Sequence, residues 1–305
     1  HVEGKIKSLI YGQDKAIENL TRSIKLSYAG LSEPNKPMGC FLFTGPTGVG
    51  KTELAKQLSN SIESKFIRLD MSEYSEKHSV ARLIGSPPGY VGYDEGGQLT
   101  EKVRRNPYTV ILLDELEKAH PDVFNILLQL LDDGRLTDAH GRVTSFKNAI
   151  VIGTSNIGSK SISEKSATIG FSSMEASKEY SKVRDLVLSE VKKIFKPEFI
   201  NRLDDLIVFH HLTSKELRQI VDLMIDNLNN RLEEKNLSID VTNKAKDCLA
   251  KDGFSETYGA RPLKRLIEDQ IENTISMKII SGEFELGGKI IVDLVRGKFN
   301  FKKSS

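Results

Sequence analysis

A glycine-rich octapeptide carries the clearest chemistry in this sequence. It reads Gly45-Pro46-Thr47-Gly48-Val49-Gly50-Lys51-Thr52 and fits the pattern G-x-x-x-x-G-K-S/T at every fixed position. An apolar run precedes it and a helical pattern follows it, as the pattern requires. Glycines let a backbone wrap closely around phosphates and aim successive N–H groups at their oxygens, and the helix N-terminus adds positive charge. The segment is therefore predicted to bind ATP, with Lys51 at the β- and γ-phosphates and the Thr52 hydroxyl on Mg²⁺.

Two adjacent carboxylates follow another apolar run, Val110–Leu113. The carboxyl ends of parallel strands line the ligand crevice of an open sheet, so both side chains should lie near the phosphates. We expect Asp114 to hold Mg²⁺, directly or through water, and Glu115 to orient and polarise the attacking water. The alternative is an acidic helix start, because Leu116, Glu117 and Lys118 follow. The phosphate loop upstream favours the catalytic interpretation.

Asn156 follows a third apolar run and offers a polar side chain at the same expected edge. There it could reach the γ-phosphate or the attacking water. The alternative is an asparagine that only forms a turn, which this residue type does readily.

The elements that must position these residues alternate along the chain. Continuous apolar runs that alternate with helical patterns predict an α/β fold, with a parallel sheet covered by helices on both faces. The expected strands are Cys40–Phe43, Phe66–Leu69, Val110–Leu113, Ala149–Ile152 and Leu206–Phe209, and the expected helices are 5–30 (interrupted at Gly12), 51–62, 121–131 and 182–194. Residues 155–181 are rich in Ser, Lys and Glu, which predicts a loop.

The remainder of the chain has a different pattern. Thr213-Ser214-Lys215-Glu216 resembles a capping box that opens a helix to about Glu234. We expect this part of the chain to continue with a strand at 238–241 and helices at 244–251 and 262–280. It ends with two short runs, 289–294 and 298–301, that pair with each other. We expect a large nucleotide-binding subdomain at 1–209 and a smaller, mostly helical α/β subdomain at 210–305.

The overall composition excludes several classes of protein. Lys and Arg number 44 against 42 Asp and Glu, so the whole chain has no electrostatic preference for nucleic acid. No apolar run approaches the roughly 20 residues that span a bilayer, and no signal peptide opens the chain. The two cysteines, Cys40 and Cys248, make neither a disulfide framework nor a zinc site. Because the chain opens on His1 rather than Met, we expect a piece of a longer protein.

Six segments, one of which includes Asp114 and Glu115, resemble one known family, the Clp-type AAA+ protein unfoldases, and within it their second ATPase module. The resemblance covers nearly the whole chain and rests on Gly12–Ala16, Leu69–Tyr74, Gly85–Tyr93, Asp114–Pro121, Phe199–Asp204 and Gly259–Pro262. It implies an ATPase that assembles as a homo-oligomer, a hexamer in the full-length protein, and threads polypeptide substrates through its central pore. It implies neither nucleic acid nor a membrane as partner.

The resemblance also implies roles for individual residues. Gly89-Tyr90-Val91-Gly92 resembles the axial pore loop, in which Tyr90 and Val91 grip polypeptide through apolar contact. Arg202 resembles the arginine finger that reaches the γ-phosphate of a neighbouring subunit. Further implied roles are Arg261 as a second sensor of nucleotide, Ile10 and Tyr11 in the adenine pocket, and Asp132–Phe146 as a second pore-facing loop.

One tripeptide bears on the branch of the family. Ile169-Gly170-Phe171 resembles the apolar segment with which some Clp unfoldases dock on a Clp-type peptidase ring. It favours ClpC-like members, from the bacterial cytoplasm or the plastid stroma. A disaggregase of the ClpB kind without a protease, a nucleic-acid-remodelling AAA+ ATPase and a non-catalytic scaffold remain alternatives.

Overall fold

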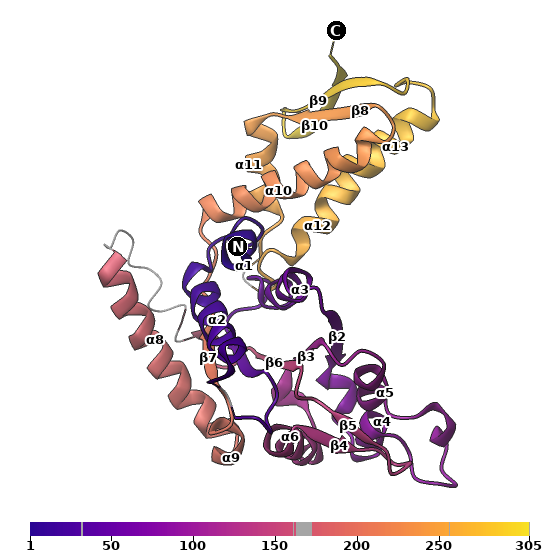
Figure 1. Ribbon diagram of the computed structural model, residues 1–305. Helices are drawn as coiled ribbons and strands as arrows, with labels where there is room; N and C mark the ends of the chain where they lie inside the picture. Colours follow the sequence, from indigo (N-terminus) through magenta and orange to yellow (C-terminus); the bar gives the residue numbers. More distant parts are fainter. Residues whose placement is uncertain (32, 161, 163–172, 256, 305) are drawn as a thin grey trace. The chain divides into compact units, whose positions relative to one another are not determined.

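The structure is a computed structural model that describes residues 1–31, 33–160, 162, 173–255 and 257–304 (Figure 1). The backbone separates into two compact units. The first holds residues 1–46 and 50–210, and the second holds residues 47–49 and 211–305. Each unit has its own sheet and its own buried apolar cluster, so each is described by itself.

The first unit is built on a five-stranded parallel sheet in the order β2-β3-β6-β1-β7. Its strands are β1 Gly39–Thr44, β2 Lys65–Asp70, β3 Thr109–Asp114, β6 Ala149–Ser155 and β7 Asp205–Val208. Every residue of β1, β3 and β6 is buried, as expected of strands covered on both faces. The α/β fold and all five expected strands are confirmed. The spatial order of the strands is new information.

Eight described α-helices belong to the first unit. They are α1 Val2–Lys7, α2 Asp14–Leu26, α3 Lys51–Ser61, α4 Lys77–Ile84, α5 Gln98–Arg105, α6 Pro121–Asp133, α8 Ser173–Ile194 and α9 Pro197–Ile200. The helix expected over 5–30 is in fact two helices followed by a π-helical turn, Ser27–Leu31, and Gly12 between them has φ of 80°. Helices α4 and α5 were not predicted.

The loop expected over 155–181 is wrong from residue 173 onward, where α8 begins nine residues earlier than the expected 182. Tyr180, Val183, Val187 and Val191 are buried at helical spacing. This apolar stripe anchors the helix in the core. The segment is rich in Ser, Lys and Glu, and of the α8 residues in it Lys178 and Ser181 are exposed.

A two-stranded antiparallel hairpin, β4 Arg135–Thr137 and β5 Val143–Ser145, lies in the segment expected to form the second pore-facing loop. Short 3-10 turns flank the site segments: Met71–Tyr74, Tyr93–Glu95 and Leu116–Lys118.

The second unit combines helices with a three-stranded sheet in the order β10-β9-β8. Its elements are α10 Ser214–Glu233, β8 Leu237–Val241, α11 Asn243–Asp252, α12 Arg261–Ile267, a π-helical turn Glu268–Glu272, α13 Asn273–Ile280, β9 Gly288–Val295 and β10 Lys298–Lys303. The expected pairing of the last two runs is confirmed, because β9 and β10 are antiparallel. The Thr213–Glu216 capping box is also confirmed, with both of its reciprocal hydrogen bonds.

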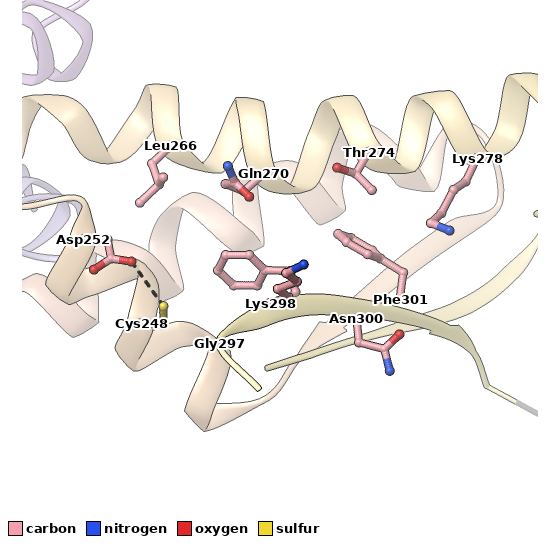
Figure 2. A pocket seen from close by; sticks show the side chains of 11 residues that line it. Cys248, Asp252, Leu266, Gln270, Thr274, Lys278, Gly297, Lys298, Asn300 and Phe301 are labelled. Atoms are coloured by element: carbon pink, nitrogen blue, oxygen red, sulfur yellow. Dashed lines mark hydrogen bonds between the residues drawn. The ribbon is translucent and has the colours of Figure 1, made fainter. Parts of the chain in front are cut away.

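A pocket of about 480 Å³ lies in the second unit, between α11, the α12–α13 helical stretch and β10 (Figure 2). Phe299 and Phe301 line it beside Cys248, whose thiol donates to Asp252 at 3.4 Å. Across the described residues, no helix has the length and apolar content needed to cross a membrane.

Candidate nucleotide site

Strand order brings the predicted site segments together. In the sheet, β6 lies between β1 and β3, so the loop after β1, the carboxylates after β3 and the end of β6 share one edge. The strand register aligns the ends of these strands, with Thr44 beside Ser155 and Leu113 beside Gly153. Three segments that are far apart in the sequence therefore meet at the carboxyl ends of neighbouring strands, where ligands bind in open α/β sheets.

Lys51 is a buried cation held at the mouth of the phosphate loop. It is 9% exposed, and its Nζ donates to the Gly45 carbonyl at 2.5 Å and the Pro46 carbonyl at 3.0 Å. It also donates to Asn156 Oδ1 at 2.9 Å. The structure thus joins Lys51 and Asn156, which the sequence analysis placed at one site on separate grounds. An ammonium so placed fits the negative charge of bound phosphates.

Two glycines of the loop show why side chains are excluded there. Gly45 has φ of 144°, and a Cβ on it would lie 2.7 Å from the carbonyl oxygen of Phe209. Gly50, with φ of 115°, is the N-cap of α3. A Cβ on Gly50 would lie 3.6 Å from Cγ2 of Ile10, so Ile10, itself buried, is beside the loop.

The other predicted binding residues of this region are less enclosed. Thr52 is the second residue of α3 and is half-buried, as is Tyr11. The Tyr11 hydroxyl donates to the carbonyl of Ser8 at 3.2 Å. Val49 is buried, whereas Thr47 and Gly48 are half-buried.

Asp114 is a buried carboxylate with partners on both oxygens. The Thr154 hydroxyl donates to Oδ1 at 2.6 Å, and the Arg68 guanidinium pairs with Oδ2 at 2.6 Å. Neither Thr154 nor Arg68 was predicted from the sequence. Their signal was indirect: Thr154 is one of two polar residues that end the apolar strand β6, and Arg68 lies on the strand next to β3.

Glu115 leaves the sheet through a backbone conformation that is uncommon for a residue with a side chain. Its φ and ψ are both 56°, and its N–H donates to the Thr154 hydroxyl at 3.0 Å. Its carboxylate accepts from Lys118 at 2.9 Å, and this hydrogen bond raises the pKa of Lys118. Strained conformations of this kind cluster at functional sites.

The predicted pore loop presents its two predicted contact residues to solvent. Tyr90 is 70% exposed and Val91 is 98% exposed. Gly89 and Gly92 flank them with φ of 85° and 87°, which residues with side chains rarely adopt.

The predicted arginine finger is held within its own unit. Arg202 forms a two-point contact with Asp132, Nε to Oδ1 at 2.5 Å and an Nη to Oδ2 at 2.8 Å, and also donates to the carbonyl of Glu198. The hydrogen bond from Arg202 lowers the pKa of Asp132. Asp132 was not predicted as the partner of Arg202.

Arg261 and the tripeptide Ile169-Gly170-Phe171 are the remaining predicted features. Arg261 is the exposed first residue of α12, with Pro262 after it, in the second unit. The tripeptide Ile169-Gly170-Phe171 lies outside the described residues.

A parallel sheet with a glycine-rich phosphate loop after a buried strand, and a buried carboxylate after the next strand but one, defines a P-loop ATPase. The chain belongs to the family described as AAA domain (Cdc48 subfamily), which matches residues 36–206. Residues 212–292 match a second family, described as the C-terminal, D2-small domain, of ClpB protein. The two matches cover the large and the small parts of an AAA+ module, as the resemblance implied.

Curated proteins of known name agree with these matches. The chain is 50% identical, over its whole length, to the negative regulator of genetic competence ClpC/MecB of Bacillus subtilis. It is 51% identical, over 96% of its length, to the ATP-dependent Clp protease ATP-binding subunit ClpC of Staphylococcus aureus strain USA300. The chain spans 38% and 36% of the length of these relatives. The resemblance to a ClpC-like second module is confirmed.

Proposed function

We propose that this chain is the motor module of a ClpC-like protein unfoldase, which hydrolyses ATP to ADP and phosphate and thereby threads polypeptide through a ring pore. One observation carries the proposal. A single compact unit gathers Lys51, Asn156, Asp114 and Glu115 at one sheet edge and also presents the exposed Tyr90 loop. A nucleotide site and an apolar grip on one unit are what mechanical coupling requires.

The residues present fit ATP with Mg²⁺. Lys51 supplies a buried positive charge, and the loop glycines leave room for close backbone approach. The Asp114 carboxylate and the Thr52 hydroxyl are oxygen ligands of the kind that Mg²⁺ prefers. The bound ion would neutralise charge on the phosphates. Ile10, beside Gly50, and Tyr11 are proposed to contact the adenine.

Glu115 is the proposed catalytic base, which positions and polarises water. Its backbone is fixed by Thr154, and its carboxylate is held by Lys118. Asn156 is proposed to bind the γ-phosphate or the attacking water, since its amide oxygen already accepts from Lys51. Both residues thus act on the same end of the nucleotide.

Assembly is proposed to complete the site. Arg202 would stabilise charge at the neighbouring protomer's nucleotide, as arginine fingers do, and Arg261 would report the state of the nucleotide. We infer a homo-oligomer, a hexamer in the full-length protein, and expect the subdomain boundary near residue 209.

The names of the relatives support the choice of partner. The Staphylococcus aureus relative is named as a Clp protease subunit, so a Clp-type peptidase is the proposed partner, with Ile169-Gly170-Phe171 as its docking segment. Both relatives are bacterial, which supports the bacterial cytoplasm, with the plastid stroma as the other expected compartment. Polypeptides, rather than nucleic acids or lipids, are the proposed substrates.

A degradation assay tests the proposal on the full-length protein. We expect a tagged folded substrate to disappear only with ATP and a Clp peptidase together, and Glu115→Gln to abolish degradation while nucleotide still binds. Glu53→Gln, which alters an exposed carboxylate on α3, is the matched control and should degrade normally. Wild-type ATP turnover by Glu115→Gln would contradict the assignment.

A ClpB-like disaggregase is the second candidate, and one observation favours it: the second family match is to the small domain of ClpB protein. The two candidates differ in their need for a peptidase. If the full-length protein rescues aggregated enzyme equally well without a peptidase, and Phe171→Ala leaves peptidase binding unchanged, the disaggregase is correct.

A further inference from the structure

The Tyr90 loop is joined to the β4–β5 turn, which follows it in the sequence. The turn comprises residues 138–142, and the loop comprises residues 85–97, between α4 and α5. Three contacts connect them, at the start, the middle and the end of the loop.

The first contact fixes the start of the loop. The Ala139 N–H donates to the carbonyl of Ile84, the last residue of α4, at 3.0 Å. Gly85, which follows, is packed closely against the turn, because a Cβ on it would lie 3.4 Å from Ala139 Cβ.

The second contact fixes the middle of the loop. The rings of Tyr93 and His140 meet edge to face, with their centroids 4.3 Å apart. The Tyr93 N–H also donates to the Tyr90 carbonyl at 3.3 Å, so the two tyrosines belong to one tight turn. The orientation of the exposed Tyr90 therefore depends on where Tyr93 is held.

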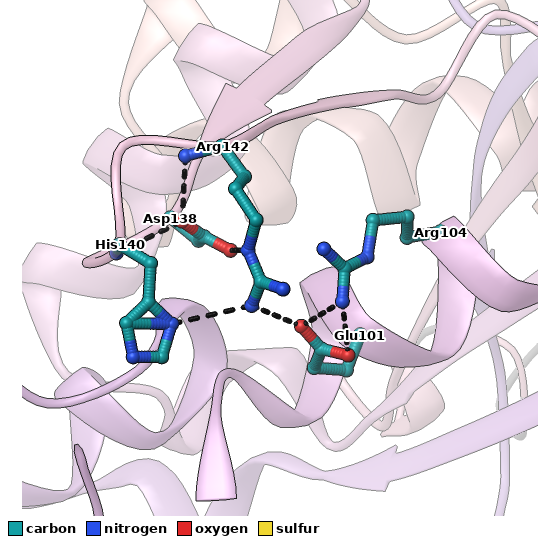
Figure 3. A network of polar contacts seen from close by, with 5 residues as sticks. All are labelled: Glu101, Arg104, Asp138, His140 and Arg142. Atoms are coloured by element: carbon teal, nitrogen blue, oxygen red, sulfur yellow. Dashed lines mark hydrogen bonds and ion pairs between the residues drawn. The ribbon is translucent and has the colours of Figure 1, made fainter. Parts of the chain in front are cut away.

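The third contact fixes the end of the loop (Figure 3). Arg142 pairs with Glu101 on α5 at 2.6 Å, and one of its Nη atoms lies 3.2 Å from His140 Nδ1. Gly96, with φ of 71°, packs on the same Glu101, because a Cβ there would lie 2.8 Å from Glu101 Cγ.

Asp138 keeps the turn itself rigid. Its side chain is 2% exposed and accepts from the N–H groups of His140 and Arg142, each at 2.9 Å, and from Arg142 Nε at 3.1 Å. Burial alone would raise the pKa of Asp138, but these hydrogen bonds outweigh burial and lower it. The ionised Asp138 carboxylate therefore holds the turn together through its hydrogen bonds and its ion pair with Arg142.

We propose that His140 and Arg142 are positioning residues, which make the β4–β5 turn a rigid support for the Tyr90 loop, so that the two segments move as one body when the motor grips polypeptide. The gripping role rests on the proposed function, whereas the mechanical link does not. Without the link, an exposed loop between glycines would sample many conformations, and fewer encounters with polypeptide would be productive.

Hydrogen exchange tests the link on the 305-residue chain and needs no substrate. In His140→Ala and Arg142→Ala we expect the amides of residues 89–97 to exchange about three times faster or more, because one or two contacts at the surface are lost. The amides of α3 and β1 should keep their wild-type rates. His140→Phe, which retains a ring against Tyr93, should restore slow exchange.

Matched controls are His78→Ala on α4 and Arg135→Ala on β4, both exposed residues of the same unit. They should leave the loop amides unchanged. Wild-type exchange at 89–97 in both His140→Ala and Arg142→Ala would overturn the proposal, and so would equal acceleration throughout the unit, which would mean general destabilisation.

The functional arm uses the full-length protein and casein as the polypeptide. We expect His140→Ala to raise the casein concentration that half-stimulates ATP hydrolysis by about threefold, with the basal rate unchanged. If the wild-type protein shows no response to casein at all, the proposed function fails while the exchange result still decides the link. A wild-type casein response in both variants, with altered exchange, would overturn the positioning role.

Discussion

The Thr154 hydroxyl donates to Asp114 Oδ1 at 2.6 Å. The Thr154 hydroxyl oxygen also accepts a hydrogen bond from the N–H of Glu115 at 3.0 Å. The Thr154 side chain therefore positions both the proposed Mg²⁺ ligand and the backbone of the proposed base. We expect Thr154 to act by fixing these two groups, which are the ones proposed to do the chemistry.

Thr154→Val should uncouple these two groups with little change in side-chain volume. A buried acceptor and a backbone donor would each lose a partner, which costs about 1–3 kcal/mol per unsatisfied group. We expect turnover of ATP to fall tenfold or more, and nucleotide affinity to change less. Turnover and binding of a fluorescent ATP analogue would be measured side by side.

Thr144→Val is the control for that substitution. Thr144 is buried, and its hydroxyl has no hydrogen-bond partner among the described residues, so the change should preserve or raise stability and leave turnover intact. Equal activity of the two variants would show that the Thr154 hydrogen bonds are not needed.

Lys51→Ala should lose nucleotide binding, in contrast to Glu115→Gln. The substitution removes the buried cation and leaves the Gly45 and Pro46 carbonyls and the Asn156 amide without their shared donor. We expect affinity for ATP to fall by at least tenfold, because the charge on the phosphates loses its nearest buried counterpart. Titration calorimetry would measure this, with Lys56→Ala, an exposed lysine of α3, as the control. Unchanged affinity would remove Lys51 from the phosphate site.

The Arg202–Asp132 pair should make a pH-dependent contribution to stability. Arg202 lowers the pKa of Asp132 below its ordinary value of 3.8, so the carboxylate is favoured in the folded state. The stabilisation is fully present above that ordinary value and is lost as pH falls through the lower, folded pKa. For a pair this exposed we expect at most about 1 kcal/mol.

Thermal unfolding of wild type and Arg202→Ala at pH 7 and near pH 2 would measure the effect. The difference in Tm should be largest at pH 7 and shrink on acidification. In assembled rings Arg202→Ala should also abolish most ATP turnover, while a single chain binds nucleotide normally. Full turnover by such rings would exclude the finger role.

The two thiols should differ in reactivity. Burial raises the pKa of Cys40, and burial together with the hydrogen bond to Asp252 raises the pKa of the half-buried Cys248. Because the thiolate is the reactive form, both should react slowly at pH 7. Ellman's reagent should label Cys248 first, and Cys40 only on unfolding.

Asp252→Asn should accelerate the labelling of Cys248, since it removes the charge that disfavours the thiolate. Asp269→Asn, on the neighbouring helical turn, should not. Fast labelling of Cys40 in the folded chain would contradict its burial in β1.

The sequence alone determined the chemistry of the phosphate loop and the strands that flank it. The requirement is local there: a glycine-rich turn must join a buried strand to a helix, and eight consecutive residues state it. Apolar runs likewise predicted all five strands of the large sheet. The run is continuous where a strand is buried on both faces, as in β1, β3 and β6, whereas β2 contains Arg68 and alternates between buried and more exposed residues.

The sequence pattern failed to predict all or part of three helices. The first part of α8 was missed because its sequence is rich in Ser, Lys and Glu, and α4 and α5 were missed because each is only eight residues long. The position of residues 169–171 lies outside what the structure describes.

Only the tertiary structure decided which partners complete the site. Thr154, Arg68 and Asp132 are distant in sequence from the groups they hold, and strand order alone brings Thr154 to Asp114. The same holds for Tyr93 and His140, which meet because a hairpin folds back on a loop. Hydrogen bonds and ring contacts depend on distances of a few ångströms in space, and spacing along a chain does not encode them.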